Sequence, residues 1–306
     1  MQDTKFLILA LRLEDITNAD LLTLITNIND AVVRYTRAGT IADQQALIEK
    51  INRLIDSFFK RYITNLVSVN QSIGKLQADN AMQVVIPMLQ KAGLYKLAIE
   101  LYNDVKSFEA SVERRLLFNG WAGKPLNYTL KTVRVGTQKT VQNIIHNAVK
   151  EGKGAKEISK MIAQYIAPID SKAKVRPLDQ YRKRFGRPKN FTPKNMPVGS
   201  LQYNALRIAR TETAHMYRQA TLEFYDDKPY IKGFTYVLSN RHPKKDICDV
   251  YSKKIYKRAE DVPLTHPNCL CRIGFLMYSR EELKRLKDGG ILTTRAVKAG
   301  KALVNI

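Results

Sequence analysis

Cysteine and histidine are rare in this chain, yet they gather in one short span. The stretch LTHPNCLCRIGF, residues 264–275, carries two of the three cysteines, and the third follows a histidine in SNRHPKKDICD. Three thiolates and one imidazole form a common tetrahedral ligand set for Zn²⁺. The pattern therefore predicts a structural zinc site whose ligands are Cys248, His266, Cys269 and Cys271, with His242 as an alternative ligand.

Three other interpretations of this cluster stay open. The C-x-C spacing is less usual for zinc than C-x₂-C, and free cysteines are often buried in protein cores without a metal. A disulfide between Cys248 and one of the other two cysteines would form in an oxidising environment. A catalytic role would use a Cys–His pair or a metal, with Glu212 of the segment RTETAH as acid or base.

Two predicted strands and a helix must position these side chains. Residues 231–239, IKGFTYVLS, alternate apolar side chains with the period of a half-buried strand. Residues 269–277, CLCRIGFLM, form the second predicted strand, and its period of two would place Cys269 and Cys271 on one face. A helix that carries RTETAH is predicted over 201–227, and a short polar helix follows the second strand.

The first half of the chain predicts helices. An apolar side chain recurs every three or four positions from Leu47 to Leu76, which is typical of one buried stripe on a long helix. Further helices are predicted over 79–92, over 94–118 and, in two parts, over 137–167. The predicted fold class is α+β and predominantly α. An elongated helical N-terminal region precedes a small mixed C-terminal domain with a short β-sheet.

Five consecutive segments follow from these patterns. Short turns between the helices favour antiparallel packing of neighbours. The segments are a helical arm or bundle suited to docking (1–120), a helical hairpin that packs on the C-terminal domain (121–167), a basic proline-rich loop or linker (168–200), the α+β domain with the Cys/His cluster (201–280), and a C-terminal helix and tail (281–306).

The charge of the chain points to a polyanionic partner. The formal net charge is +23, from 51 Lys and Arg against 28 Asp and Glu, and an excess of this size favours nucleic acid. The segment 168–200 is basic and carries interleaved aromatic residues, so it is either a solvated linker or a contact for DNA phosphates. The predicted nucleic-acid contacts are Lys172, Lys174, Arg176, Arg182, Lys183, Arg184, Arg187, Lys189 and Lys194.

We expect a protein that is made in a reducing cytosol and does not enter a membrane. The apolar run FLILAL near the N-terminus is too short for a secretion signal, and AMQVVIPML is too short to span a bilayer. The small, odd number of cysteines argues against a secreted disulfide-rich domain. In such a compartment, thiols beside histidines favour a metal over a disulfide.

The order of motifs in the last third resembles that of the Mu F-like minor head proteins of tailed phages, also called phage head morphogenesis proteins. The order is RIARTET, a strand, SNRHPKKDICD, a spacer and LTHPNCLCRI, and the resemblance covers roughly residues 130–278. The family ending is His-Pro-Asn-Cys-Arg-Cys, and Leu270 stands here in place of that arginine. The family motif falls on Arg207, Arg210, Glu212, His242, Asp246, Cys248, His266, Cys269 and Cys271.

This resemblance implies a minor capsid protein that is not an enzyme. Its location would be the virion, in the capsid interior near the portal, and the host cytoplasm during assembly. Its partners would be the portal protein or major capsid protein and double-stranded DNA, and its role procapsid assembly or genome delivery. The alternative is a metal-dependent, nuclease-like enzyme that uses the Cys/His cluster, and a weaker third possibility is a cytosolic DNA-binding regulator.

Overall fold

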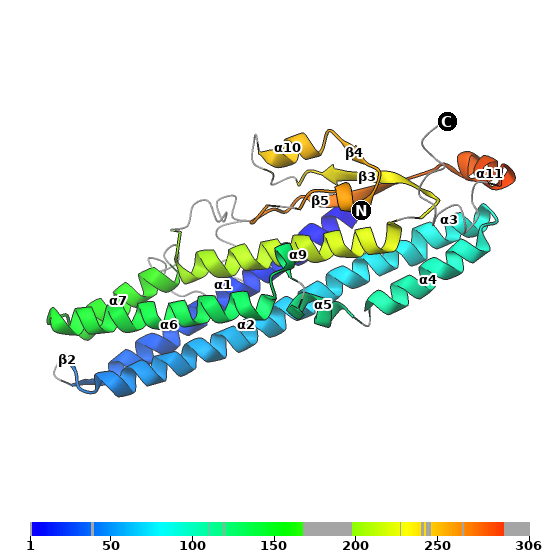
Figure 1. Cartoon of the computed structure of the whole chain (residues 1–306). Coiled ribbons are helices and arrows are strands. Elements are labelled where there is room, and N and C mark those ends of the chain that lie inside the picture. Colours follow the sequence, from blue (N-terminus) through cyan, green and yellow to red (C-terminus); the bar gives the residue numbers. More distant parts are fainter. Residues whose placement is uncertain are drawn as a thin grey trace. The chain divides into compact units, whose positions relative to one another are not determined.

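The computed structural model describes most of the chain and confirms the predicted fold class, which is predominantly α with a small antiparallel sheet (Figure 1). The predicted nucleic-acid contacts between 172 and 194 lie outside the described residues. The residues described are 2–37, 40–109, 111–118, 120–167, 198–226, 228–239, 242, 246–264 and 266–290.

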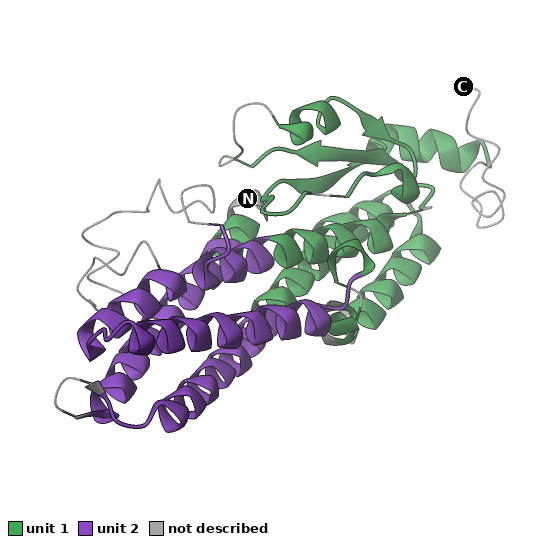
Figure 2. Cartoon of the chain, turned by 60° about the vertical axis from the view of Figure 1, so that its left-hand side comes forward, with its two compact units in different colours: residues 1–9, 69–123, 211–306 green, residues 10–68, 124–210 purple. Residues whose placement is uncertain are grey.

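The chain forms two compact units, and each takes stretches that are far apart in the sequence (Figure 2). Unit 1 comprises the described residues of 1–9, 69–123 and 211–306, and unit 2 those of 10–68 and 124–210. Three long helices each contribute residues to both units. The division into five consecutive segments stays a prediction, because sequence order does not reveal which helices pack together.

Unit 2 is built from helices that lie side by side, drawn in purple in Figure 2. Its helical parts belong to α1 (Gln2–Arg34), α2 (Gln44–Asn80), α6 (Leu126–Lys150), α7 (Ala155–Ile166) and α9 (Leu201–Tyr225), and a short hairpin pairs β1 (Thr36–Arg37) with β2 (Thr40–Ile41).

Helix α2 confirms the predicted apolar stripe. Every residue of the stripe is buried except Leu54, which is half-buried because the neighbouring Ile55 takes the core position. The helix starts where the side chain of Asp43 accepts a hydrogen bond of 2.9 Å from the backbone N–H of Ala46, which satisfies a donor that the first turn leaves unpaired.

Unit 1 holds a second group of helices and differs from the prediction at their ends. Helix α2 continues into the π-helical η1 (Ala81–Val85) and then into α3 (Ile86–Lys91), which has Pro87 as its second residue. Gly93, with φ of 73°, ends α3. The helix predicted over 94–118 is two helices, α4 (Tyr95–Glu109) and α5 (Val112–Phe118).

The sheet of unit 1 has the order β4-β3-β5, and both pairings are antiparallel. Its strands are β3 (Ile231–Val237), β4 (Ile255–Tyr256) and β5 (Arg272–Met277), accompanied by α10 (Ile247–Tyr251), α11 (Arg280–Asp288) and the single turns η2 (Trp121–Gly123) and η4 (Ala259–Asp261). The ring of Tyr225 at the end of α9 lies 3.8 Å from that of Phe275 in β5, centroid to centroid, so α9 packs against the sheet.

Candidate metal centre

Helix α10 presents Cys248 through a capping arrangement at its N-terminus. The side chain of Asp246 accepts from the backbone N–H of Cys248 at 2.6 Å, and the side chain of Asp249 accepts from the backbone N–H of Asp246 at 2.7 Å. This capping box fixes a helix of only five residues, which has little stability of its own. The thiol of Cys248 is therefore held at a defined place inside unit 1.

The segment before β5 presents the other two thiols, and the predicted strand over 269–277 is confirmed only from residue 272 onward. Strand β5 begins at Arg272, so Cys269 and Cys271 precede it. Asn268 lies in the left-handed region with φ of 66°, which turns the chain, and the backbone N–H of Cys271 donates to the sulfur of Cys269 at 3.3 Å instead of to a strand. The two thiols are positioned by a turn and not by the period of a strand.

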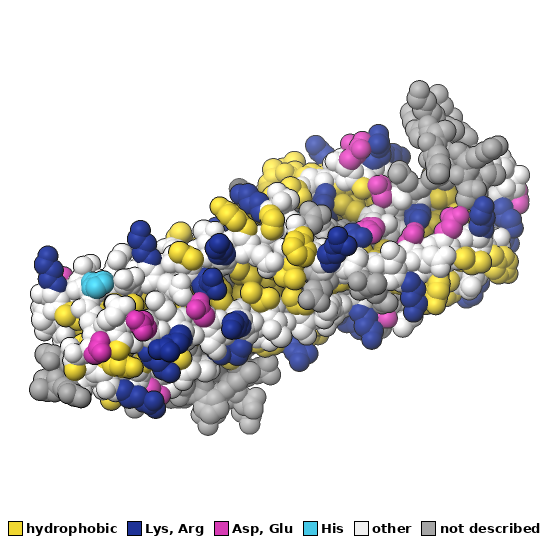
Figure 3. All heavy atoms as spheres, turned by 60° about the horizontal axis from the view of Figure 1, so that its bottom comes forward, with side chains coloured by type: hydrophobic (Ala, Val, Ile, Leu, Met, Phe, Trp, Pro, Cys, Tyr) yellow, Lys and Arg dark blue, Asp and Glu magenta, His cyan; other side chains and the backbone are white. Residues whose placement is uncertain are grey.

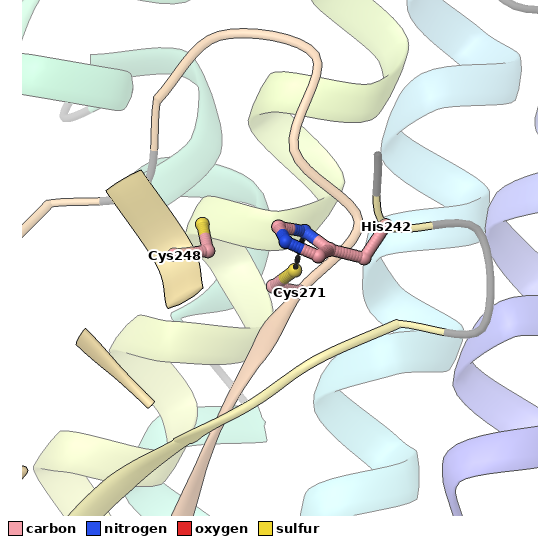
Figure 4. A group of neighbouring side chains, drawn as sticks. All are labelled: His242, Cys248 and Cys271. Carbon is pink, nitrogen blue, oxygen red and sulfur yellow. Dashed lines mark hydrogen bonds between the residues drawn. The ribbon is translucent and has the colours of Figure 1, made fainter. Parts of the chain in front are cut away.

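The three thiols and two histidines form two groups that share Cys248. In one group the ligand atoms of Cys248, His242 and Cys271 lie within 4.8 Å of one another, and in the other those of Cys248, His266 and Cys269 do. Figure 4 shows the first group, in which the three side chains point toward one another from α10, from the loop after β3 and from the segment before β5.

The closest distances between ligand atoms match a tetrahedral metal site. The sulfurs of Cys248 and Cys269 are 3.6 Å apart, and the sulfur of Cys271 is 3.4 Å from Nδ1 of His242. Metal–sulfur bonds of about 2.3 Å and metal–nitrogen bonds of about 2.0 Å imply roughly 3.5–3.8 Å between neighbouring ligands of a tetrahedron. The cluster could therefore hold a metal ion, and its members are His242, Cys248, Cys269 and Cys271, with His266 beside them.

Both histidines have a carboxylate neighbour. Nε2 of His242 lies 3.0 Å from Oδ2 of Asp249, which favours the tautomer whose Nδ1 lone pair faces Cys271. Burial lowers the pKa of His242, but the hydrogen bond to Asp249 and the nearby Cys271 and Asp246 raise it by more, so the pKa is raised overall.

His266 carries an orphaned ring nitrogen. Its Nδ1 is 2.8 Å from the carbonyl oxygen of Pro267, which requires a proton on Nδ1. Its Nε2 is buried without a hydrogen bond and lies 3.1 Å from Oδ2 of Asp246. His266 is also a member of the second group of possible metal ligands, with Cys248 and Cys269.

The thiols are buried and electrostatically linked. Cys248, Cys269 and Cys271 have exposed fractions of 0%, 2% and 1%, and all three are free. Hydrogen bonds from the thiols of Cys248 and Cys269 lower the pKa of Cys271, and the backbone of Ser239 contributes to the same effect. The pKa of Cys248 is raised, chiefly by its hydrogen bonds with Cys269 and Cys271. One thiolate is thus stabilised even without a metal.

No family model, curated protein or solved structure matches this chain. None of the described helices is both long and apolar enough to cross a membrane. The resemblance to the Mu F-like proteins therefore stays a hypothesis that depends on the motif residues alone.

Helix α9 holds both ends of the segment that leads to Cys269. The hydroxyl of Thr211 accepts from the backbone N–H of Asn268 at 3.1 Å, and the guanidinium of Arg218, two turns later on α9, donates to the carbonyl oxygen of Val262 at 2.7 Å. Burial lowers the pKa of Arg218. Neither residue stands out in the sequence, although their spacing of seven positions places both on one face of the helix.

Thr211→Val should weaken metal binding about tenfold, because the turn at Asn268 loses its acceptor while the shape of the side chain is kept. The metal dissociation constant is measured by competition with a chelator of known affinity. Thr211→Ser keeps the hydroxyl and serves as the control. Equal affinities for the two variants would show that the hydroxyl does not position the turn.

The other four residues of the family motif, Arg207, Arg210, Glu212 and Asp246, are divided between the two units. In unit 2, Arg207 is exposed and Arg210 forms a buried ion pair with Glu14. In unit 1, both carboxylate oxygens of Glu212 face the backbone N–H of Trp121, at 3.4 and 3.1 Å. The carboxylate of Asp246 lies 3.7 Å from Nε2 of His242 and 3.1 Å from Nε2 of His266.

Because of Glu212, we expect the free energy of unfolding to decrease as the pH rises from about 4.5 to about 7. Burial raises its pKa from 4.5 to about 7, and the hydrogen bond from Trp121 opposes this only partly. Glu212 ionises at a lower pH in the unfolded chain than in the folded one, so the free energy of unfolding decreases progressively across this window. Above about pH 7 the total loss is about 3 kcal/mol. Urea denaturation of the wild type and Glu212→Gln at several pH values measures the difference. Parallel pH profiles would contradict the shift.

Proposed function

We propose that this chain is a non-enzymatic minor head protein of a tailed phage, and that one zinc ion fastens the part of unit 1 that carries the cluster. The zinc site is supported by the burial of all three thiols and by two ligand-atom distances, 3.6 and 3.4 Å, that are close to those of a tetrahedral site. A structural zinc site is closed in this way, whereas a catalytic one keeps a position open for water or substrate. The zinc ion would supply folding free energy and no reaction step.

The metal would be bound by Cys248, Cys269, Cys271 and one imidazole. Zinc is favoured over magnesium or calcium because sulfur and nitrogen ligands suit it. Elemental analysis of protein purified without chelator should give one zinc per chain. The zinc contents of His242→Ala and His266→Ala then identify the fourth ligand. The variant that lacks the ligand binds less zinc, and the other keeps the wild-type content. A zinc-free wild type with intact structure would refute the proposal.

The head assignment depends on the motif order that resembles the Mu F-like proteins. It is supported by the contacts of the motif residues, which are structural: Arg210 with Glu14, Glu212 with the backbone of Trp121 and Asp246 with the histidines. We expect the protein to be recovered from assembled particles with the portal or major capsid protein. Its absence from purified particles would contradict the assignment.

The alternative is a nuclease-like enzyme, and a single pair of measurements separates the two. An enzyme would show metal-dependent cleavage of DNA or RNA that disappears in Cys248→Ala while the fold survives. The structural proposal instead predicts that Cys248→Ala unfolds part of unit 1 and that the wild type has no cleavage activity. Melting curves beside a cleavage assay distinguish these outcomes.

DNA contact by the nine basic residues between 172 and 194 is part of the proposal. Neutralising six to nine phosphates should give a log–log slope of affinity against salt of about −5 to −8. Fluorescence anisotropy with a labelled duplex measures it. An affinity that barely changes with salt would rule out the DNA contact.

A further inference from the structure

The charge of unit 2 is segregated between its helices. Residues 10–68, which supply α1 and α2, carry seven Lys and Arg against seven Asp and Glu, so they are neutral. Residues 124–167, which supply α6 and α7, carry eight against two. A surface that only needs solubility intersperses both signs, because like charges repel. The α6–α7 hairpin therefore carries a charge excess that folding alone does not require.

Helix α6 has no Asp or Glu in its 25 residues. Lys131, Lys139 and Lys150 are exposed and form no ion pair with any residue that the structure describes. At 100° per residue, the three fall within an arc of about 100°. Most buried residues of the helix, such as Leu130, Thr137 and Val141, fall on the opposite side. The lysines thus share one outward face.

Apart from the half-buried Val149, the other residues of this arc are exposed, and none of them carries a negative charge. They include Tyr128, Thr132, Val135 and Gln142. Hydroxyl and amide groups donate hydrogen bonds to phosphate oxygens beside lysines. Figure 3 shows the surface over α2 and α6, where dark blue Lys and Arg side chains are spread widely and magenta acidic ones are fewer.

We propose that this outer face of α6, defined by Lys131, Lys139 and Lys150, binds the phosphate backbone of double-stranded DNA without reading its sequence. The lysines are about 12 and 16 Å apart along the helix axis, and a duplex carries a charge every ~1.7 Å of its axis, so each meets a separate phosphate. A protein partner fits less well, because lysine is depleted at protein interfaces.

This face would be a second DNA contact beside the one in the proposed function. It is inferred from the charges of unit 2 alone. The test uses the full chain, a fluorescein-labelled 30-bp duplex of arbitrary sequence and 50–200 mM salt. The variant is Lys131→Gln/Lys139→Gln/Lys150→Gln. The matched control is Lys91→Gln/Lys96→Gln/Lys106→Gln, which removes the same charge from the end of α3 and from α4, a helix that also carries acidic residues.

The α6 variant should bind at least tenfold more weakly at 100 mM salt, with a salt slope smaller by about 3, because three phosphate contacts are lost. The control should change affinity less than threefold. Equal losses in both variants would overturn the proposal by showing diffuse attraction. So would an unchanged α6 variant, or a chain that binds polyglutamate and not DNA. None of these results bears on the assignment as a minor head protein. That assignment is tested separately, by whether the protein is found in purified particles.

Discussion

Cys248→Ser is expected to abolish stoichiometric metal binding and to destabilise unit 1 by an amount on the order of 5 kcal/mol. Cys248 is the thiol common to both ligand groups, so its loss removes a ligand from either arrangement. The structure that it fastens is small, since α10 has five residues and β4 has two. Elements of this length do not persist without a tertiary fastening.

The measurement pairs zinc content with denaturation followed by near-UV circular dichroism. Ser252→Ala is a matched control, because Ser252 borders α10 and contributes no ligand. Adding a strong chelator should lower the wild-type melting temperature to that of Cys248→Ser and leave the variant unchanged. A variant that keeps its zinc content and stability would contradict the fastening role.

The sequence sufficed to locate the cluster because ligand chemistry depends on residue type. Cys and His are rare in this chain, so their clustering is visible in the sequence, and the capping box at Asp246 involves only neighbouring residues. The prediction that Cys269 and Cys271 share a strand face was wrong for a conformational reason. A left-handed Asn268 redirects the chain before β5, and alternation within an apolar run does not report such a turn.

Long-range partners were not predictable from sequence patterns. Periodicity shows that a helix face is buried, as for the stripe of α2, but it does not name what covers that face. The carboxylate that pairs with Arg210 lies 196 positions earlier, and the donor to Glu212 lies 91 positions earlier. The motif RTE therefore reads as an exposed charged segment in the sequence, while the structure buries two of its charges in separate contacts.

Breaking the buried ion pair of unit 2 should cost about 3–5 kcal/mol of stability. Nε of Arg210 lies 2.6 Å from Oε1 of Glu14, and the guanidinium also reaches Oε2 at 2.9 Å. The side chains are 6% and 5% exposed, so water cannot replace a lost partner. Urea denaturation of Glu14→Ala and Arg210→Met measures the loss. Glu49→Ala, an exposed position on α2, should change stability by less than about 0.5 kcal/mol.

The double variant Glu14→Leu/Arg210→Met separates a structural pair from a functional one. Removing both charges leaves no uncompensated group, so stability should return to within about 1–2 kcal/mol of the wild type. If the double variant is stable and is also found in assembled particles, the motif arginine acts only through the fold. A double variant as unstable as the single ones would show that Arg210 and Glu14 owe their stabilising effect to other neighbours.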